Sequence, residues 1–173
     1  MTSTPATARP SIQRITPFLW FEHDAEAAVH FYVSVFDDSR ITRVARYGKE
    51  GARAAGQPEG TVMTVGFELA GQAFSAINGG PVFRITPAVS FVVNCENQAE
   101  IDRYWAALAD GGDAAAQQCG WLKDRFGVSW QIVPVQLPAL LGDADAAQSG
   151  RVMAALMAMK KLDLAGLERA AAG

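Results

Sequence analysis

The sequence of 173 residues predicts an α+β fold, in which two βαβββ modules are followed by a helical C-terminal extension. Three observations support this prediction. The same order of strand and helix signals occurs twice, and the tripeptide Ile-Thr-Pro opens both copies, at residues 15–17 and 85–87. Near the end of the chain, apolar residues recur at helical spacing. We expect the modules at residues 12–80 and 81–135, and the extension at residues 136–173.

The first module begins with an apolar stretch over residues 15–21 that is rich in strand-forming residues. Asp24 is the candidate N-cap of the helix that follows. A strand is expected over residues 39–47, then a glycine-rich loop, then a hairpin over residues 61–79 that turns near Ala70 and Gly71. The apolar stripe of the helix consists of Ala27, Ala28, Phe31, Tyr32 and Val35.

The second module repeats this order in a shorter form. Residues 85–94 read as a strand, and residues 96–112 as a helix that ends at Gly111 and Gly112. Two or three short strands are expected between residues 114 and 134. Each predicted helix carries an aromatic pair, Phe31-Tyr32 in the first module and Tyr104-Trp105 in the second, which favours an internal duplication.

Composition limits the classes of function. The formal net charge of −3 gives no reason to expect nucleic acid as a partner. Arginine and lysine are nevertheless concentrated in residues 39–53, which form either a solvated strand and loop or the rim of an anion-binding site. The N-terminal residues 1–11 are polar and lack the apolar core of a signal peptide, so we expect a disordered tail. No apolar run is long enough to span a membrane. With two cysteines that lack metal-type spacing, the prediction is a cytoplasmic protein with free thiols and no membrane partner.

Several stretches of the chain resemble the vicinal-oxygen-chelate superfamily, which includes glyoxalase I, extradiol dioxygenases and bleomycin-resistance proteins. They are ITPFLWF with DAEAAVHFYVSVF, SFVVNCENQAEIDRYW, QQCGWLKDRFGVSWQIVP and RVMAALMAMKKLDLAGLERA. The chain looks most like the PhnB-like branch, labelled "3-demethylubiquinone-9 3-methyltransferase domain". The resemblance implies that each module curves into half of a cup, that the two form a half-open barrel, and that the protein is a homodimer. The C-terminal extension then covers the domain or the dimer partner, or forms a methionine-rich lid.

In that superfamily a divalent metal is often held by four side chains from the first and last strands of each module. The resemblance places Pro17, Ser75, Ala88 and Gln131 at these positions. Proline and alanine offer no side-chain donor, serine is a poor ligand, and only glutamine is a residue type that the superfamily uses. The two histidines, His23 and His30, fall at the start of the first helix and within it. We therefore expect no metal at the usual place, and no cofactor.

Strand alternation predicts which side chains face the cup. Val128, Trp130 and Ile132 should pack against the helices, while Ser129 and Gln131 face inward, Gln131 bonding either a neighbouring strand or a ligand. By the same alternation Pro17, Leu19 and Phe21 are inward-facing, with Phe18 and Trp20 behind. The expected ligand pocket consists of Phe21, Ser75, Ser90, Ser129 and Gln131, with Trp121 and Lys123 at its rim. Lys123 and Asp124 are expected either to form an ion pair at this rim or to act at the pocket mouth.

Other chemistry finds little support in the sequence. A methyltransferase that uses S-adenosylmethionine has a glycine-rich turn after its first strand, and the residues after this first strand, EHDAEAAV, contain no glycine. Cys95 and Cys119 have no obvious base and read as small buried hydrophobes. The favoured hypothesis is a metal-free protein that binds a small, partly aromatic organic ligand. Two alternatives remain: a metal-dependent lyase, isomerase or dioxygenase with a displaced site, and a metal-free enzyme whose acid–base residues the sequence does not identify. Whether there is catalysis is left undecided.

Overall fold

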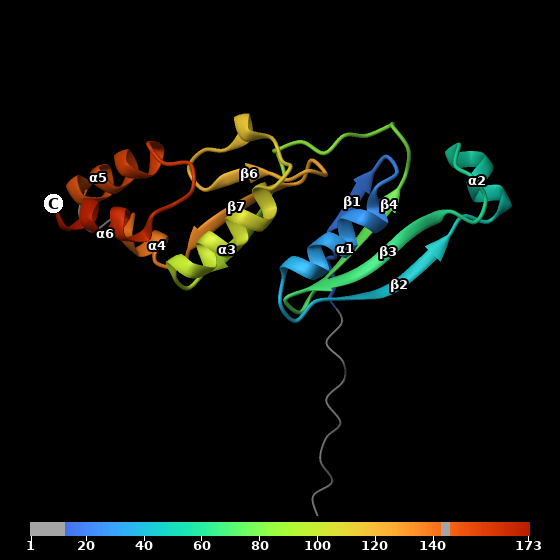
Figure 1. The fold of residues 1–173 in the computed structure, drawn as a ribbon, viewed down its shortest axis with the longest axis horizontal. Helices are drawn as coiled ribbons and strands as arrows, with labels where there is room; N and C mark the ends of the chain where they lie inside the picture. The colour runs from blue at the N-terminus through green and yellow to red at the C-terminus, as the bar shows by residue number, and fades with distance from the viewer. Residues whose placement is uncertain (1–12, 143–145) are drawn as a thin grey trace, which may run out of the picture.

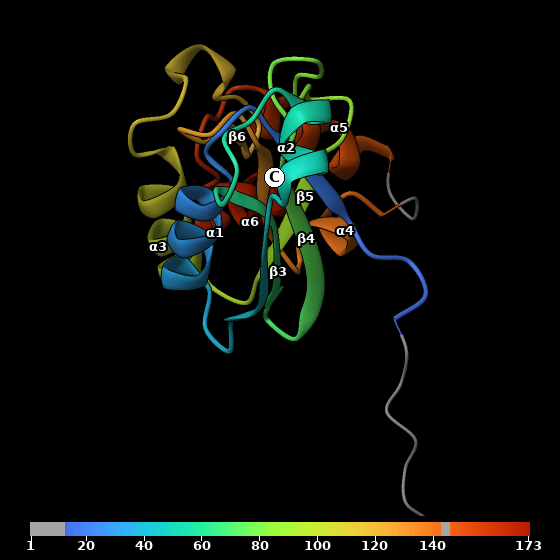
Figure 2. The same cartoon turned by 90° about the vertical axis from the view of Figure 1, so that its right-hand side faces the viewer.

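The computed structural model describes residues 13–142 and 146–173, so the predicted disordered tail at residues 1–11 lies outside the described residues. Two small sheets lie side by side, and helices α1 and α3 cover the same side of both (Figures 1 and 2). We call the covered side of each sheet its helix face and the other side its open face. Among the described helices, none is long and apolar enough to cross a membrane.

The first sheet has the strand order β1-β4-β3-β2. It is built from β1 (Phe18–Phe21), β2 (Arg40–Arg46), β3 (Val62–Leu69) and β4 (Gln72–Asn78), with α1 (Ala25–Val35) packed on one face. β1 runs parallel to β4, and the other pairs are antiparallel. Asp24 is the residue before α1, as expected, but its side chain makes no capping bond. The buried amide oxygen of Asn78 instead accepts from the N–H of Ala25, which ties the end of β4 to the start of α1.

One helix was missed in the first module. The segment predicted as a glycine-rich loop contains α2 (Lys49–Ala55). Gly48 precedes it in an extended conformation, and Gly56 ends it in the left-handed region, with a φ of 65°. This is the usual use of glycine after a helix, so the same glycines that suggested a loop are the boundaries of a short helix.

The second sheet has three strands in the order β5-β7-β6, namely β5 (Phe91–Cys95), β6 (Trp121–Lys123) and β7 (Ser129–Pro134). Residues 81–135 are all described, and they contain no counterpart of β2. The short 3-10 helix η1 (Ala114–Ala116) and a turn at Cys119 and Gly120, both at positive φ, stand in its place. The second module is thus a βαββ unit, with two strands after its helix, the smaller of the two numbers expected, and lacks the third strand of a full βαβββ unit.

Helix α3 (Gln98–Ala109) packs on the second sheet. Its N-cap Asn97 accepts from the N–H of Glu100, and the Glu100 carboxylate accepts from the N–H of Glu96. The helix faces of both sheets share one core, and the helix-face prediction for Val128, Trp130 and Ile132 is confirmed because all three are buried in it. Trp130 lies against the rings of Tyr32 and Phe36 from the first module, at centroid distances of 5.4 Å for both.

The C-terminal extension forms α4 (Leu137–Leu140), α5 (Ala146–Met157) and α6 (Leu164–Ala172), around a small core of its own. It is joined to the second module by main-chain bonds from Cys119 N to Met159 O and from Gly120 N to Lys160 O, each 2.8 Å. The Gln98 amide of α3 adds a fork, donating to Leu162 O and accepting from Leu164 N. The extension therefore covers the turn that leads into β6.

Candidate functional site

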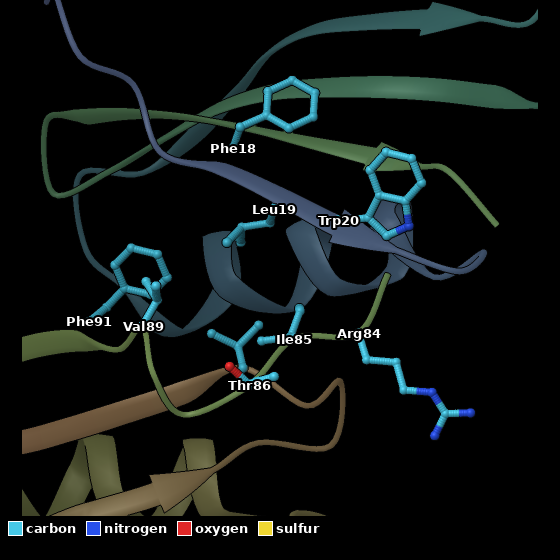
Figure 3. Close-up of a pocket in the computed structure, with 9 residues that line it drawn as sticks. Phe18, Leu19, Trp20, Arg84, Ile85, Thr86, Val89 and Phe91 are labelled. Carbon is cyan, nitrogen blue, oxygen red and sulfur yellow. The ribbon is translucent and has the colours of Figure 1, made fainter. Parts of the chain in front are cut away.

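A cavity of about 260 Å³ lies between β1 and the segment that connects the two sheets (Figure 3). Phe18, Leu19 and Trp20 form one wall, and the connecting segment and the start of β5 form the other. The second wall consists of Arg84, Ile85, Thr86, Val89, Phe91 and Val128. Apart from Arg84 and Thr86 these side chains are apolar, and three of the nine carry aromatic rings. A cavity of this size and lining suits a single aromatic ring with one or two polar groups.

Trp20 is the best fixed of the three rings. Its indole N–H donates to the carbonyl of Gly80 at 3.0 Å, and the ring of Phe83 meets it edge to face at 4.9 Å. Gly79 makes the close approach possible, because a Cβ at that position would lie 2.1 Å from the indole. The Gly79-Gly80 pair thus holds the tryptophan in place: Gly79 leaves room for the ring, and the Gly80 carbonyl accepts the hydrogen bond from the indole N–H.

A second cavity of about 410 Å³ lies at the junction of the two modules, next to the free edge of β5. It is lined by the aromatic residues Phe36, Phe74, Phe91, Tyr104 and Trp130, the polar residues Gln72, Ser90 and Asn94, and the smaller apolar residues Leu69, Ala70, Val92 and Val93. The Tyr104 ring stacks on Phe36 at 5.2 Å, and its hydroxyl accepts from the Arg103 guanidinium. This cavity has more polar groups than the first, and the two share Phe91.

The residues predicted for the pocket do not converge on either cavity. Of that set only Ser90 lines one, the second. Gln131 donates to the Ser90 hydroxyl at 2.8 Å and lies between Val92 and Trp121 in the strand register, so these side chains share the open face of the second sheet. Ser129 pairs with Lys123 in the same sheet and is buried. The structure therefore supports the structural alternative for Gln131, a bond to a neighbouring segment.

The first strand faces the opposite way from the prediction. Phe21 is 4% exposed and belongs to the shared core, and Leu19 is buried beside it. Phe18 is in register with Ser75, and it is 58% exposed on the open face. The placement of Phe21 in the pocket is thus corrected, since a shift of one residue exchanges the two faces of a strand. Phe18 and Trp20, which were expected behind the sheet, line the cavity together with Leu19.

The four positions that the superfamily uses for metal binding do not fit a metal here. The Pro17 carbonyl accepts from the N–H of Ser75, and Ala88 lies in an exposed turn before β5. The register brings Phe18, not Pro17, beside Ser75, and phenylalanine offers no donor either. Within residues 13–142 and 146–173 no three His, Cys, Asp or Glu side chains are grouped so that they could share a metal ion. The side chains at Pro17, Ser75 and Ala88 thus leave Gln131 without partners for a metal site.

Asp124 is the largest departure from the sequence prediction, since it forms no rim ion pair with Lys123. It is 2% exposed and accepts four hydrogen bonds. The Tyr32 hydroxyl and the Trp130 indole donate to Oδ2 at 2.8 Å each, and the N–H groups of Phe126 and Val128 donate to Oδ1 at 2.8 and 3.0 Å. Because Tyr32 belongs to the first module, this carboxylate joins the two modules inside the core.

Burial raises the pKa of Asp124 above its ordinary value, although the four donors oppose the shift. The folded protein therefore keeps this proton at pH values where the unfolded chain has lost it. The contribution of Asp124 to folding stability should fall as the pH rises above 3.8, the ordinary aspartate value. Urea unfolding of the wild type and of Asp124→Asn at several pH values measures the effect. The stability of the wild type relative to the variant should decrease with rising pH, and a constant difference would contradict the expectation.

Cys95 and Tyr32 are unsuited to nucleophilic or base catalysis. Burial, followed by the charge of Glu100, raises the pKa of Cys95 to about 11, so its thiol stays protonated near neutral pH. Burial also holds the pKa of Tyr32 well above its ordinary range, with the Asp124 carboxylate as the next cause. Tyr32 thus remains a hydrogen-bond donor to Asp124.

Comparison with known proteins assigns the fold. The model of the family described as 3-demethylubiquinone-9 3-methyltransferase matches residues 13–133. A PhnB protein from Bacillus cereus is 40% identical, with a TM-score of 0.62, over 71% of this chain and 100% of its own. A protein from Staphylococcus aureus is 32% identical over 70% of this chain and 96% of its own, with a TM-score of 0.32. A protein from Pseudomonas aeruginosa is 23% identical over 72% and 98%, with a TM-score of 0.56.

Among curated proteins none matches the chain. The similarity to the Bacillus cereus structure confirms the predicted α+β fold of paired modules. That solved chain is matched over its whole length, so the unmatched part of the present chain has no counterpart in it.

Proposed function

The chain belongs to the family described as 3-demethylubiquinone-9 3-methyltransferase, the PhnB-like branch with the vicinal-oxygen-chelate fold, and we propose that it binds a small aromatic ligand without a metal. The ligand would occupy the cavity between β1 and the connecting segment. The modules would extend over residues 12–80 and 81–135, with the extension at 136–173, in a cytoplasmic protein.

One observation carries this proposal: the cavity is walled by Phe18, Trp20 and Phe91, and Trp20 is fixed there by two glycines. Aromatic walls bind planar ligands through apolar burial and edge or face contacts. Arg84 lines the cavity, and Figure 3 shows its guanidinium reaching away from the rings of Phe18, Trp20 and Phe91. A phenolate or carboxylate group at this end of the ligand would be attracted to the Arg84 cation.

Methyl transfer is not part of the proposal, despite the printed description of the family. Enzymes that bind S-adenosylmethionine on a doubly wound parallel sheet use a glycine-rich turn after the first strand. Here β1 is followed by Glu22, His23 and Asp24, and both sheets mix parallel and antiparallel pairs. Residues 13–142 and 146–173 offer no equivalent of that nucleotide cradle.

The edge strands β1 and β5 support a homodimer. β1 and β5 are edge strands of their sheets, and the exposed residues Phe18, Val89 and Val92 lie at or beside these two edges. A second copy could set its β5 beside β1 and its β1 beside β5, so that each cup is completed across the dimer. Light scattering after size exclusion measures this directly. A mass of two chains supports the arrangement, and a monomer at high concentration overturns it.

The binding proposal is tested with 4-nitrophenol, a single-ring phenol that absorbs visible light and quenches tryptophan fluorescence. Saturable binding to the wild type is expected. Trp20→Leu should weaken this binding about tenfold or more, because the largest aromatic side chain of the cavity lining is lost. Trp105→Leu is the matched control, since Trp105 lies on α3 and lines neither cavity. If Trp20→Leu binds as tightly as the wild type, or if both variants lose affinity equally, the assigned cavity is wrong.

A further inference from the structure

Phe91 is the one residue that lines both cavities. The lining that Phe91 completes in the first cavity also includes Leu19, Val89 and Val128. The Phe91 ring contacts Phe74 and Trp130, at centroid distances of 5.3 and 5.5 Å, and these two residues line only the second cavity. The side chain thus stands between a cavity of about 260 Å³ and one of about 410 Å³.

The position of Phe91 in the fold leaves its side chain less constrained than the other core rings. It is the first residue of β5, and residues 79–90 before it contain no helix or strand. It is half-buried, whereas Trp130, its partner in the register, is 3% exposed. Rotation of a ring at the start of an edge strand disturbs fewer neighbours than rotation inside the sheet.

The two cavities also differ in chemistry. The first is apolar apart from Arg84 and Thr86, while the second places Gln72, Ser90 and Asn94 among its aromatic residues. A ligand that reached past Phe91 would therefore keep one ring in the apolar cavity and present a second ring with hydrogen-bonding groups to the other.

We propose that Phe91 is the partition that sets the size of ligand the protein accepts, admitting single-ring aromatics and rejecting rigid two-ring ones. This inference rests on the proposed function, because it deepens the description of the same cavity. Removing the ring would join the two cavities into one extended site. Phe91 is accordingly a specificity-determining residue, and the preferred ligand class is a monocyclic aromatic compound.

The test compares 4-nitrophenol with 4-hydroxy-4′-nitrobiphenyl, which carries the same two substituents on one additional ring. Equilibrium dialysis gives the affinity of each probe for the wild type and for Phe91→Ala. The wild type should bind the biphenyl about tenfold more weakly than the phenol. Phe91→Ala should bind the biphenyl about tenfold more tightly than the wild type does, while its affinity for the phenol should fall because the first cavity loses one of its aromatic walls.

Phe36→Ala is the matched control. Phe36 lines the second cavity alone, and its ring contacts are with Tyr104 and Trp130, so its loss enlarges that cavity and leaves the partition in place. It should not improve binding of the biphenyl. Phe91→Leu shortens the side chain but keeps it apolar, so its affinity for the biphenyl should lie between those of the wild type and Phe91→Ala. It replaces the alanine variant if that variant fails to fold.

The outcomes separate the two proposals. If the wild type binds neither probe, the proposed function is overturned. If the wild type binds the phenol but neither Phe91 variant gains affinity for the biphenyl, the partition is overturned while the binding function stands. An equal gain in Phe36→Ala also overturns it, because the size limit then depends on the second cavity and not on Phe91.

Discussion

Asp124→Ala should lower the free energy of unfolding by about 4 kcal/mol, since it leaves the buried donors of Tyr32, Trp130 and Val128, and the half-buried N–H of Phe126, without their acceptor. Each unsatisfied buried donor costs about 1–3 kcal/mol, and the four are not additive because a water molecule can enter the space left by the carboxylate. The loss should be visible as a lower urea midpoint in both far-ultraviolet circular dichroism and tryptophan fluorescence. Trp130 reports directly, because its indole N–H is one of the four donors.

Two further variants separate this network from a surface ion pair. Lys123→Ala should change stability by no more than about 0.5 kcal/mol, because the Asp124 carboxylate is fully engaged with other groups. Tyr32→Phe removes one donor and should cost about 1 kcal/mol. If Asp124→Ala and Lys123→Ala had the same small effect, the pair would be a solvated rim contact, as the sequence had suggested, and the account of the module junction would fail.

Gly79→Ala should cost about 3 kcal/mol and abolish binding of the reporter phenol. A Cβ at this position would lie 2.1 to 2.5 Å from three atoms of the Trp20 indole, so either the ring or the backbone must move. The φ of Gly79 is not positive, which means that the cost is steric and not conformational. Displacement of the indole would also break its bond to the Gly80 carbonyl and close part of the cavity.

Gly48→Ala is the control for this substitution. Gly48 also lies outside the positive-φ region, and a Cβ there would meet nothing within 4 Å. It should leave both the urea midpoint and the affinity for 4-nitrophenol within error of the wild type. If Gly79→Ala behaves like this control, Trp20 is not held as described and the cavity does not depend on it.

The modules could be predicted from the sequence because strand and helix periodicity are local properties. The helix face of β7 was also predictable, since Trp130 and Ile132 alternate with Gln131 in a short strand. The face of β1 was not, because it was inferred from the metal position that Pro17 would occupy, and a one-residue difference in register reverses the strand.

The role of Asp124 was hidden for a different reason. In sequence it stands between Lys123 and Arg125, a pattern typical of a solvated turn. Its partner Tyr32 is 92 positions away, so only the packing of α1 against the second module shows that the carboxylate is buried. The first cavity, between β1 and the connecting segment, had no local sequence signal either, because half of its wall comes from a segment without hydrophobic periodicity. The pair Gly79-Gly80 after β4 was the one available sign that a large ring packs there.

The central claim, that the cavity binds a small aromatic ligand without a metal, is tested most directly by equilibrium dialysis of 4-nitrophenol against chelator-treated protein. Elemental mass spectrometry of the same sample confirms that metal has been removed. We expect saturable binding that is unchanged when Zn²⁺, Ni²⁺, Mn²⁺ or Fe²⁺ is restored, and that is weakened about tenfold or more in Trp20→Leu. Binding that appears only after one of these ions is added would contradict this expectation, and would point to a metal site away from Pro17, Ser75, Ala88 and Gln131.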